Sequence, residues 1–129
     1  VDEISIADTI GVAVPTQVTD LVYRLKSVIG EVPLRLHFHN TRNTGIGNVY
    51  AAAEAGVRIF DSSCGGLGGC PFAPGATGNV GTEDVLYLFE RMGYQTSISM
   101  AKLIETSKWL GEVMGQEMPA MLNKAGSFP

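Results

Sequence analysis

The fold is decided by the stretch Asp61–Asp84, which reads DSSCGGLGGCPFAPGATGNVGTED and holds both cysteines and seven of the sixteen glycines. Glycine lacks packing surface and costs backbone entropy inside a helix or strand, so this stretch is predicted to be a loop. An apolar, strand-like run at residues 57–60 precedes it, and a helical pattern at residues 85–92 follows it. A glycine-rich loop between a strand and a helix is where α/β proteins place their chemistry.

The same alternation of strand and helix extends over the rest of the chain. Short apolar runs predict strands at residues 4–8, 34–39 and 57–61. Apolar residues at helical spacing predict helices at residues 15–29, 44–55, 82–92 and 99–114, and a last short turn at 119–124. Thr82 and Ser99 are expected to cap helices. The inner face of the first helix is expected to consist of Val18, Leu21, Val22, Leu25, Val28 and Ile29.

This order of elements predicts an α/β fold with parallel strands linked by helices. A closed (β/α)8 TIM barrel takes about 250 residues, whereas this chain has 129. We therefore predict a partial TIM barrel, with about the last three β/α units and the C-terminal helices. A small open α/β sheet is the other interpretation. Because Val1 opens almost directly on a strand, the chain is expected to be part of a longer one.

Composition limits the classes of partner. The net charge of −4 argues against a nucleic-acid surface, and no apolar run is long enough to span a bilayer. No secretory signal is visible, and two cysteines six positions apart do not suggest a disulfide framework. A reducing compartment is therefore expected, either the cytoplasm or, after removal of a transit peptide, the matrix of an organelle.

Two histidines and an aspartate follow predicted strands. His37 and His39 lie two residues apart at a strand end, so their side chains share one face. In a barrel this end is the mouth of the active site, where two imidazoles and oxygen donors can bind one divalent cation. The alternative is that both are ordinary polar residues at a strand end. Asp8 could bind a metal, orient a metal-bound water or act as a base, or it could cap the loop at residues 9–11.

The glycine-rich stretch adds three further candidates. Cys70 lies in GGCP, where an accessible thiol could exchange a proton over an active site; the alternative is a small filler before a proline turn. Cys64 is interpreted as a packing residue, and a Cys64–Cys70 redox pair is disfavoured. Asn79 could supply a neutral oxygen ligand or form a turn. The sequence lacks the nucleotide-binding fingerprints and the spacing of a zinc finger.

Three motifs in matching order resemble one family. The loop GGLGGCPFAPGATGNVGTED resembles the cysteine-bearing signature loop of 3-hydroxy-3-methylglutaryl-CoA lyases. Upstream, HFHNTR resembles that family's HxHDT, and ISIADTIGV resembles its ISxxDTIG strand. The resemblance covers essentially the whole chain. It implies that residues 1–129 are the C-terminal part of a single lyase-type TIM-barrel domain.

The resemblance also implies roles for the candidates. His37, His39 and Asn79 match the family's metal ligands, and the metal would be Mg²⁺ or Mn²⁺. Cys70 matches the catalytic loop cysteine and Asp8 an aspartate of proton transfer, so the implied catalytic residues are Cys70, Asp8 and His37. The implied reaction is the retro-Claisen cleavage of an acyl-CoA substrate, hydroxymethylglutaryl-CoA, to acetyl-CoA and acetoacetate.

The chain departs from the family pattern at several points. Asn40 stands where the family has Asp, which suggests a related substrate such as citramalyl-CoA. The strand that carries the family's adjacent Arg and Asp is absent, so the chain alone is predicted to be inactive. The expected partners are further copies in a homo-oligomer or the missing N-terminal half of the barrel. A non-catalytic assembly piece and a synthase or aldolase of the same superfamily are the other interpretations.

Overall fold

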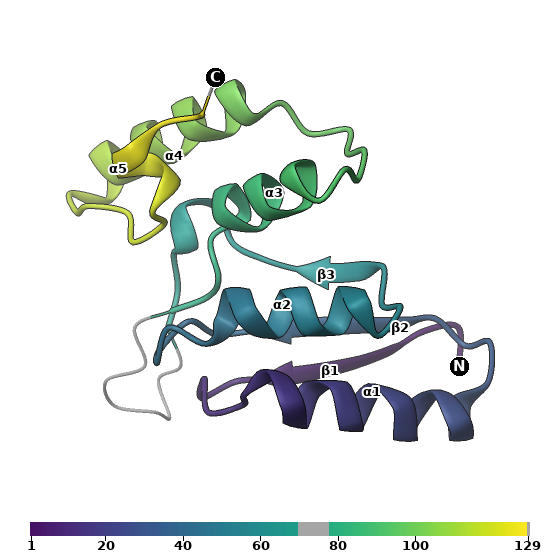
Figure 1. Ribbon diagram of the computed structural model, residues 1–129. Helices are drawn as coiled ribbons and strands as arrows, with labels where there is room; N and C mark the ends of the chain where they lie inside the picture. The colour runs from purple at the N-terminus through teal and green to yellow at the C-terminus, as the bar shows by residue number, and fades with distance from the viewer. Residues whose placement is uncertain (70–77, 129) are drawn as a thin grey trace.

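The computed structural model describes residues 1–69 and 78–128. Three β/α units follow one another along the chain (Figure 1). The strands are β1 (Ile4–Asp8), β2 (Leu34–Phe38) and β3 (Ile59–Asp61), and they form one parallel sheet in the order β1-β2-β3. The helices are α1 (Pro15–Ile29), α2 (Gly45–Glu54), the 3-10 turn η1 (Cys64–Gly66), α3 (Thr82–Arg91), α4 (Met100–Met114) and α5 (Leu122–Ala125).

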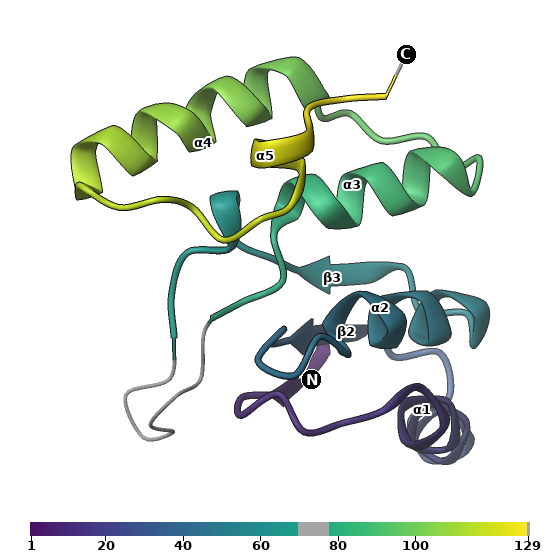
Figure 2. The same ribbon diagram turned by 60° about the vertical axis from the view of Figure 1, so that its left-hand side comes forward.

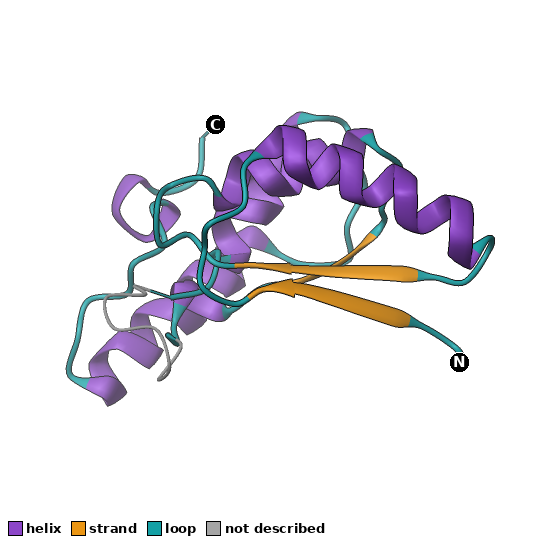
Figure 3. Ribbon diagram, turned by 90° about the horizontal axis from the view of Figure 1, so that it is seen from below, coloured by secondary structure: helices purple, strands orange, loops and turns teal. Residues whose placement is uncertain are grey.

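The two faces of the sheet differ in chemistry. One face carries Leu34, Leu36 and Phe38 of β2, all at most 6% exposed, and packs against α1 and α2. The other face carries Arg35 and His37, which are only half-buried. Figure 3 shows a helix along one side of the strands near the N-terminus, while the opposite side of these strands is bare. In a TIM barrel the bare face is the interior.

The core lies between the sheet and its first two helices. Val22, Val49 and Ala52 are at most 1% exposed and close the space between α1, α2 and the strands. Full burial of such an aliphatic side chain stabilises the fold by about 1.5–3 kcal/mol. Figures 1 and 2 agree in placing α3, α4 and α5 beyond β3, on the side away from α1. No helix in the described part of the chain has the length and apolar character to cross a membrane.

Two predictions for α1 are wrong. Val28 is 84% exposed and Leu21 is 41% exposed. Val18, Val22, Leu25 and Ile29 form the stripe of α1 that packs into the core. At 3.6 residues per turn, Val28 and Leu21 lie at the edge of this stripe. Ile29, the last residue of the helix, still packs against the core, so Val28 is exposed because of its position around the helix. Leu21 lines a shallow pocket beside β1, at the free edge of the sheet.

Of the two predicted helix caps, Ser99 is confirmed and Thr82 is wrong. Ser99 caps α4 as predicted, because its hydroxyl accepts from the backbone N–H of Lys102 at 3.5 Å. Thr82 does not cap α3. It is the first helical residue, Gly81 occupies the N-cap position, and the Thr82 hydroxyl lies 2.9 Å from the Ser62 hydroxyl.

Candidate active site at the carboxyl edge of the sheet

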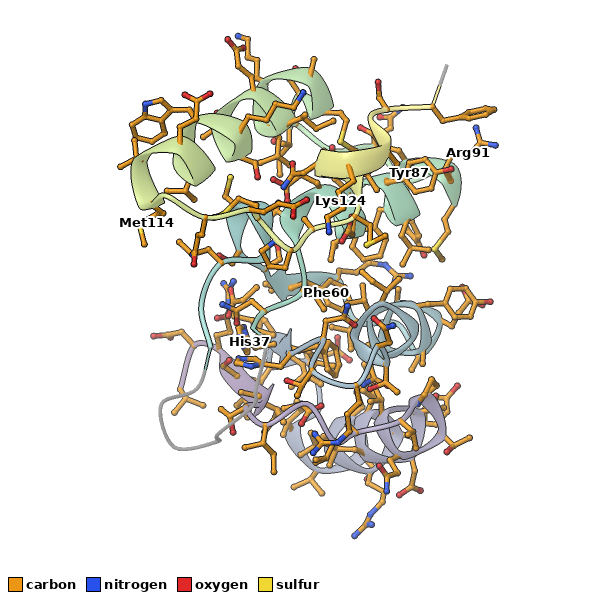
Figure 4. The ribbon with its side chains drawn as sticks, turned by 90° about the vertical axis from the view of Figure 1, so that its left-hand side faces the viewer. His37, Phe60, Tyr87, Arg91, Met114 and Lys124 are labelled. Carbon is orange, nitrogen blue, oxygen red and sulfur yellow. The ribbon has the colours of Figure 1, made fainter. Side chains whose placement is uncertain are left out.

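The candidate residues gather where the three strands end. Because the strands are parallel, the residues that follow their carboxyl ends meet at one edge of the sheet. Figure 4 looks onto this edge and shows His37 there. His39 follows β2 directly, and the glycine-rich stretch begins after β3.

The two imidazoles lie against each other. The ring centroids of His37 and His39 are 5.2 Å apart, with their planes at 67°. His39 is only 5% exposed, and its buried Nδ1 has no hydrogen-bond partner among the described residues. Burial and the nearby His37 lower the pKa of His39, although the Asp8 carboxylate opposes them. A neutral imidazole with an unpartnered nitrogen has a lone pair available to a metal.

Backbone hydrogen bonds place Asn79 directly opposite His39. The Val80 N–H donates to Phe38 O at 3.1 Å, and the Asn40 N–H donates to Gly78 O at 3.0 Å. These bonds make His39 and Asn79 a directly opposed, non-hydrogen-bonded antiparallel pair, whose side chains share one side with Cβ atoms about 4.5–5.5 Å apart. The Asn79 Nδ2 donates to Leu67 O at 2.8 Å, so its Oδ1 is the atom left for a ligand.

The two ends of the glycine-rich stretch, residues 63–68 and 78–81, are hydrogen-bonded to each other. The Ser63 N–H donates to Val80 O at 3.1 Å, and the Asn79 N–H donates to Gly68 O at 3.0 Å. Glu83 of α3 is fully buried, and its two carboxylate oxygens accept from the Gly65 N–H at 2.8 and 3.0 Å. The sequence carries no signal for this anchor, because an acidic residue in a first helical turn is usually exposed. The Glu83 carboxylate therefore fixes residues 63–68, and the Leu67 carbonyl of this segment accepts from the Asn79 amide.

Asp8 takes the geometry of a loop cap. Its Oδ1 accepts from the Val12 N–H and its Oδ2 from the Ala13 N–H, both at 3.0 Å. In register it pairs with Phe38, and so it lies on the face opposite to His37. Asp8 therefore shapes the loop after β1, and its role in proton transfer stays a prediction.

Cys70, the other candidate for proton transfer, lies outside the described residues. Cys64 lies half-buried in η1, where its thiol donates to Glu83 Oε1 at 3.7 Å. Burial, and then the Glu83 carboxylate, raise the pKa of the Cys64 thiol. These contacts fit the predicted packing role.

Cys64 should react slowly with thiol reagents, because a raised pKa lowers its thiolate fraction. In a Cys70→Ser variant, we expect DTNB at pH 8 to modify Cys64 at least ~10-fold more slowly than free cysteine. The same variant in concentrated urea serves as the control and should react at the free rate. Native labelling as fast as that of the unfolded chain would contradict a packing role.

The residues present fit a divalent cation. Among the described residues, the buried His39 Nδ1 has no hydrogen-bond partner and Asn79 Oδ1 makes no hydrogen bond. Two imidazoles and one amide oxygen leave positions open for substrate and water, which is typical of a catalytic site. Within residues 1–69 and 78–128, no group of three or more His, Cys, Asp or Glu side chains could hold a metal. A metal site built only from His, Cys, Asp and Glu is thus absent from the described residues, and the candidate site includes the amide of Asn79.

Comparison with known proteins identifies relatives along nearly the whole chain. A model of the HMGL-like family matches residues 1–110. (R)-citramalyl-CoA lyase of Chloroflexus aurantiacus is 49% identical over 124 residues, which cover 96% of this chain and 39% of that protein. Hydroxymethylglutaryl-CoA lyase YngG of Bacillus subtilis is 42% identical over 120 residues, which cover 93% of this chain and 40% of that protein.

A solved structure shows the same fold. The HMG-CoA lyase of Acinetobacter baumannii, in complex with coenzyme A and 3-methylmalate, matches with a TM-score of 0.92 and 47% identity. The match covers 100% of this chain and 44% of that one. The chain thus spans about two fifths of the length of the curated relatives named above. The prediction of a partial (β/α)8 barrel is confirmed.

Proposed function

Because the chain belongs to the HMGL-like family, we propose that the protein containing it is a metal-dependent lyase that cleaves a carbon–carbon bond of a 3-hydroxyacyl-CoA. The observation that carries this proposal is the convergence of His37, His39 and Asn79 at the carboxyl edge of the sheet. The non-catalytic assembly interpretation gives no reason for the buried His39 Nδ1 to lack a hydrogen-bond partner among the described residues.

The proposed metal is Mg²⁺ or Mn²⁺, held by His37, His39 and Asn79. When bound, it supplies a Lewis acid that polarises the hydroxyl and carboxylate oxygens of the substrate. The chain's part is to orient the ligands. The Leu67 carbonyl holds the Asn79 amide at 2.8 Å, and the backbone pairing with Gly78 and Val80 fixes His39.

The proposed reaction is a retro-Claisen cleavage. The 3-hydroxyl gives its proton to a base, the bond between C2 and C3 breaks, and C3 becomes a ketone. The electron pair remains on C2 of the thioester, which then takes up a proton. We propose Asp8 as the base from its place in the ISIADTIGV motif, and its carboxylate is near enough to His39 to act on that ring electrostatically. We propose Cys70 as the acid, as its place in the loop motif implies.

Two related acyl groups are candidates for the substrate. Hydroxymethylglutaryl-CoA and citramalyl-CoA both carry a 3-hydroxyl, a 3-methyl and a carboxylate, and they differ by one methylene. Citramalyl-CoA is supported by the 49% identity to (R)-citramalyl-CoA lyase, and hydroxymethylglutaryl-CoA by the 47% identity to the Acinetobacter baumannii HMG-CoA lyase. One methylene in a binding pocket changes kcat/KM by about 10–200-fold. A direct comparison of the two thioesters can therefore distinguish them.

The test is an acetyl-CoA release assay on the protein that contains this chain, with Mg²⁺ or Mn²⁺ and with EDTA. Each thioester is supplied separately, and the second product identifies it: acetoacetate from hydroxymethylglutaryl-CoA, pyruvate from citramalyl-CoA. We expect metal-dependent release from at least one of them. Absence of release from both would refute the lyase proposal, and release that survives EDTA would refute its metal dependence.

The rest of the barrel is part of the same proposal. In the described sheet, β1 and β3 each pair only with β2 and leave one edge free. We propose that further β/α units cover these edges, from another part of the same protein or from another copy in a homo-oligomer. Unpaired strand edges favour such pairing.

A further inference from the structure

An ion network crosses the bare face of the sheet directly below His37. The Arg35 Nε and Nη2 donate to the two carboxylate oxygens of Glu3 at 2.8 and 3.2 Å. The Arg35 Nη1 donates to Asp61 Oδ1 at 2.7 Å. Glu3 precedes β1, Arg35 lies in β2 and Asp61 ends β3, so the network ties the three strands together.

The sheet register places Asp61 beside His37. His37 pairs with Asp61 of β3 and with Ala7 of β1, whereas Arg35 pairs with Ile59 and Ser5. Paired residues of neighbouring parallel strands share a face, and the strands are about 4.8 Å apart. The Arg35 side chain therefore extends toward the carboxyl edge of the sheet and binds Asp61, the residue that lies directly across from His37.

Asp61 has capacity for a second partner. Arg35 occupies Oδ1, and Oδ2 makes none of the hydrogen bonds among the described residues. The His37 ring likewise makes no hydrogen bond within this part of the chain, and its contact there is with the His39 ring. A histidine that binds a metal through one ring nitrogen usually donates its other N–H to a carboxylate, which fixes the tautomer and orientation of the ring.

Surface stabilisation alone does not account for this geometry. The side chains of Arg35, Glu3 and Asp61 are 32%, 35% and 43% exposed, and exposed ion pairs add little stability. A side-on pair with Glu3 instead leaves Nη1 of Arg35 aimed at Asp61. Three of the five N–H donors of Arg35 are used by two carboxylates, which balance its charge and raise its pKa above the usual range.

We propose that Asp61 is a positioning residue for His37, and that Arg35, held by Glu3, keeps the Asp61 carboxylate in place. This inference rests on the proposed function, since it treats His37 as a metal ligand. Asp61 accepts the ring N–H of His37 and so presents the other ring nitrogen to the cation. Neither Asp61 nor Arg35 touches the metal or the substrate.

The first test reads the His37 ring in the metal-free protein that contains this chain. Side-chain ¹⁵N shifts report which ring nitrogen carries the proton. We expect one dominant His37 tautomer in the wild type and a mixture in Asp61→Asn. Arg24→Met, which breaks the exposed Arg24–Asp20 pair of α1, is the control and should leave the His37 shifts unchanged. Identical His37 shifts in Asp61→Asn and wild type would overturn the proposal.

The second test measures Mn²⁺ affinity by the EPR signal of the free ion. We expect Asp61→Asn to weaken binding by about 10–100-fold and Arg35→Met to weaken it less. The double variant should match Asp61→Asn alone, because Arg35 acts through Asp61. An unchanged affinity in Asp61→Asn would overturn the positioning role and leave the lyase proposal standing. Absence of Mn²⁺ binding by the wild type would instead refute the proposed metal site, and the positioning role of Asp61 would be refuted with it.

Discussion

A His39→Ala variant is expected to lose Mn²⁺ binding and about a thousandfold in kcat. The buried Nδ1 of His39 has no partner among the described residues, and burial lowers the pKa of the ring so that it stays neutral. A metal's electrostatic stabilisation of a transition state is worth several kcal/mol, and about 4 kcal/mol corresponds to ~10³ in rate. Mn²⁺ titration followed by EPR and the acetyl-CoA release assay measure the two effects.

Asn43→Gly is the matched control for this experiment. Asn43 lies in the same carboxyl-edge loop and has a φ of 59°, which glycine adopts without strain. It is not a proposed ligand, so Mn²⁺ affinity should stay within twofold of the wild type. The thermal unfolding of each variant shows whether a loss of binding reflects the missing imidazole or an unfolded chain. A folded His39→Ala protein that binds Mn²⁺ normally would exclude His39 as a ligand.

A Gly45→Ala variant is expected to destabilise the fold by about 1–3 kcal/mol, the usual cost of overpacking a filled site. A Cβ at Gly45 would lie 2.5 Å from Val80 Cγ1 and 2.9 Å from the His39 carbonyl oxygen. Val80 and His39 belong to the backbone pairing that aligns Asn79 with His39. The added methyl should therefore also weaken Mn²⁺ binding, without removing any ligand.

Gly47, two residues further along α2, provides the opposite control. A Cβ there would meet only Pro15 Cγ, at 3.4 Å, which is an ordinary contact. Gly47→Ala should stabilise the protein by about 0.5–1 kcal/mol, since alanine has less backbone freedom to lose in a helix. Urea unfolding of the two variants measures both values. Equal stabilities would mean that the close approach at Gly45 does not constrain the site.

The local patterns of the sequence predicted much of the scaffold. Alternation and helical spacing gave the three strands and the helices, and the spacing of His37 and His39 predicted their common face, which the structure confirms. These features depend on neighbours within one or two turns of the chain. Val28 was predicted to face inward by the same spacing, but it lies at the edge of the apolar stripe of α1 and is exposed.

The long-range contacts could not be read from such patterns. The pairing of His39 with Asn79 joins residues forty positions apart, and only the folded backbone brings them together. Glu83 carries no sequence signal that separates a buried anchor from an exposed first-turn acid. The ion pairs of Arg35 with Glu3 and Asp61 could likewise not be predicted, because these partners lie far from Arg35 in the sequence.

One cation shared by His37, His39 and Asn79 is the centre of the proposed site. The most direct measurement is anomalous diffraction at the manganese edge from crystals of the protein grown with Mn²⁺. We predict a single anomalous peak within ligand distance of both imidazoles and of Asn79 Oδ1. A peak at any other place in the protein, with these three side chains unliganded, would contradict the account.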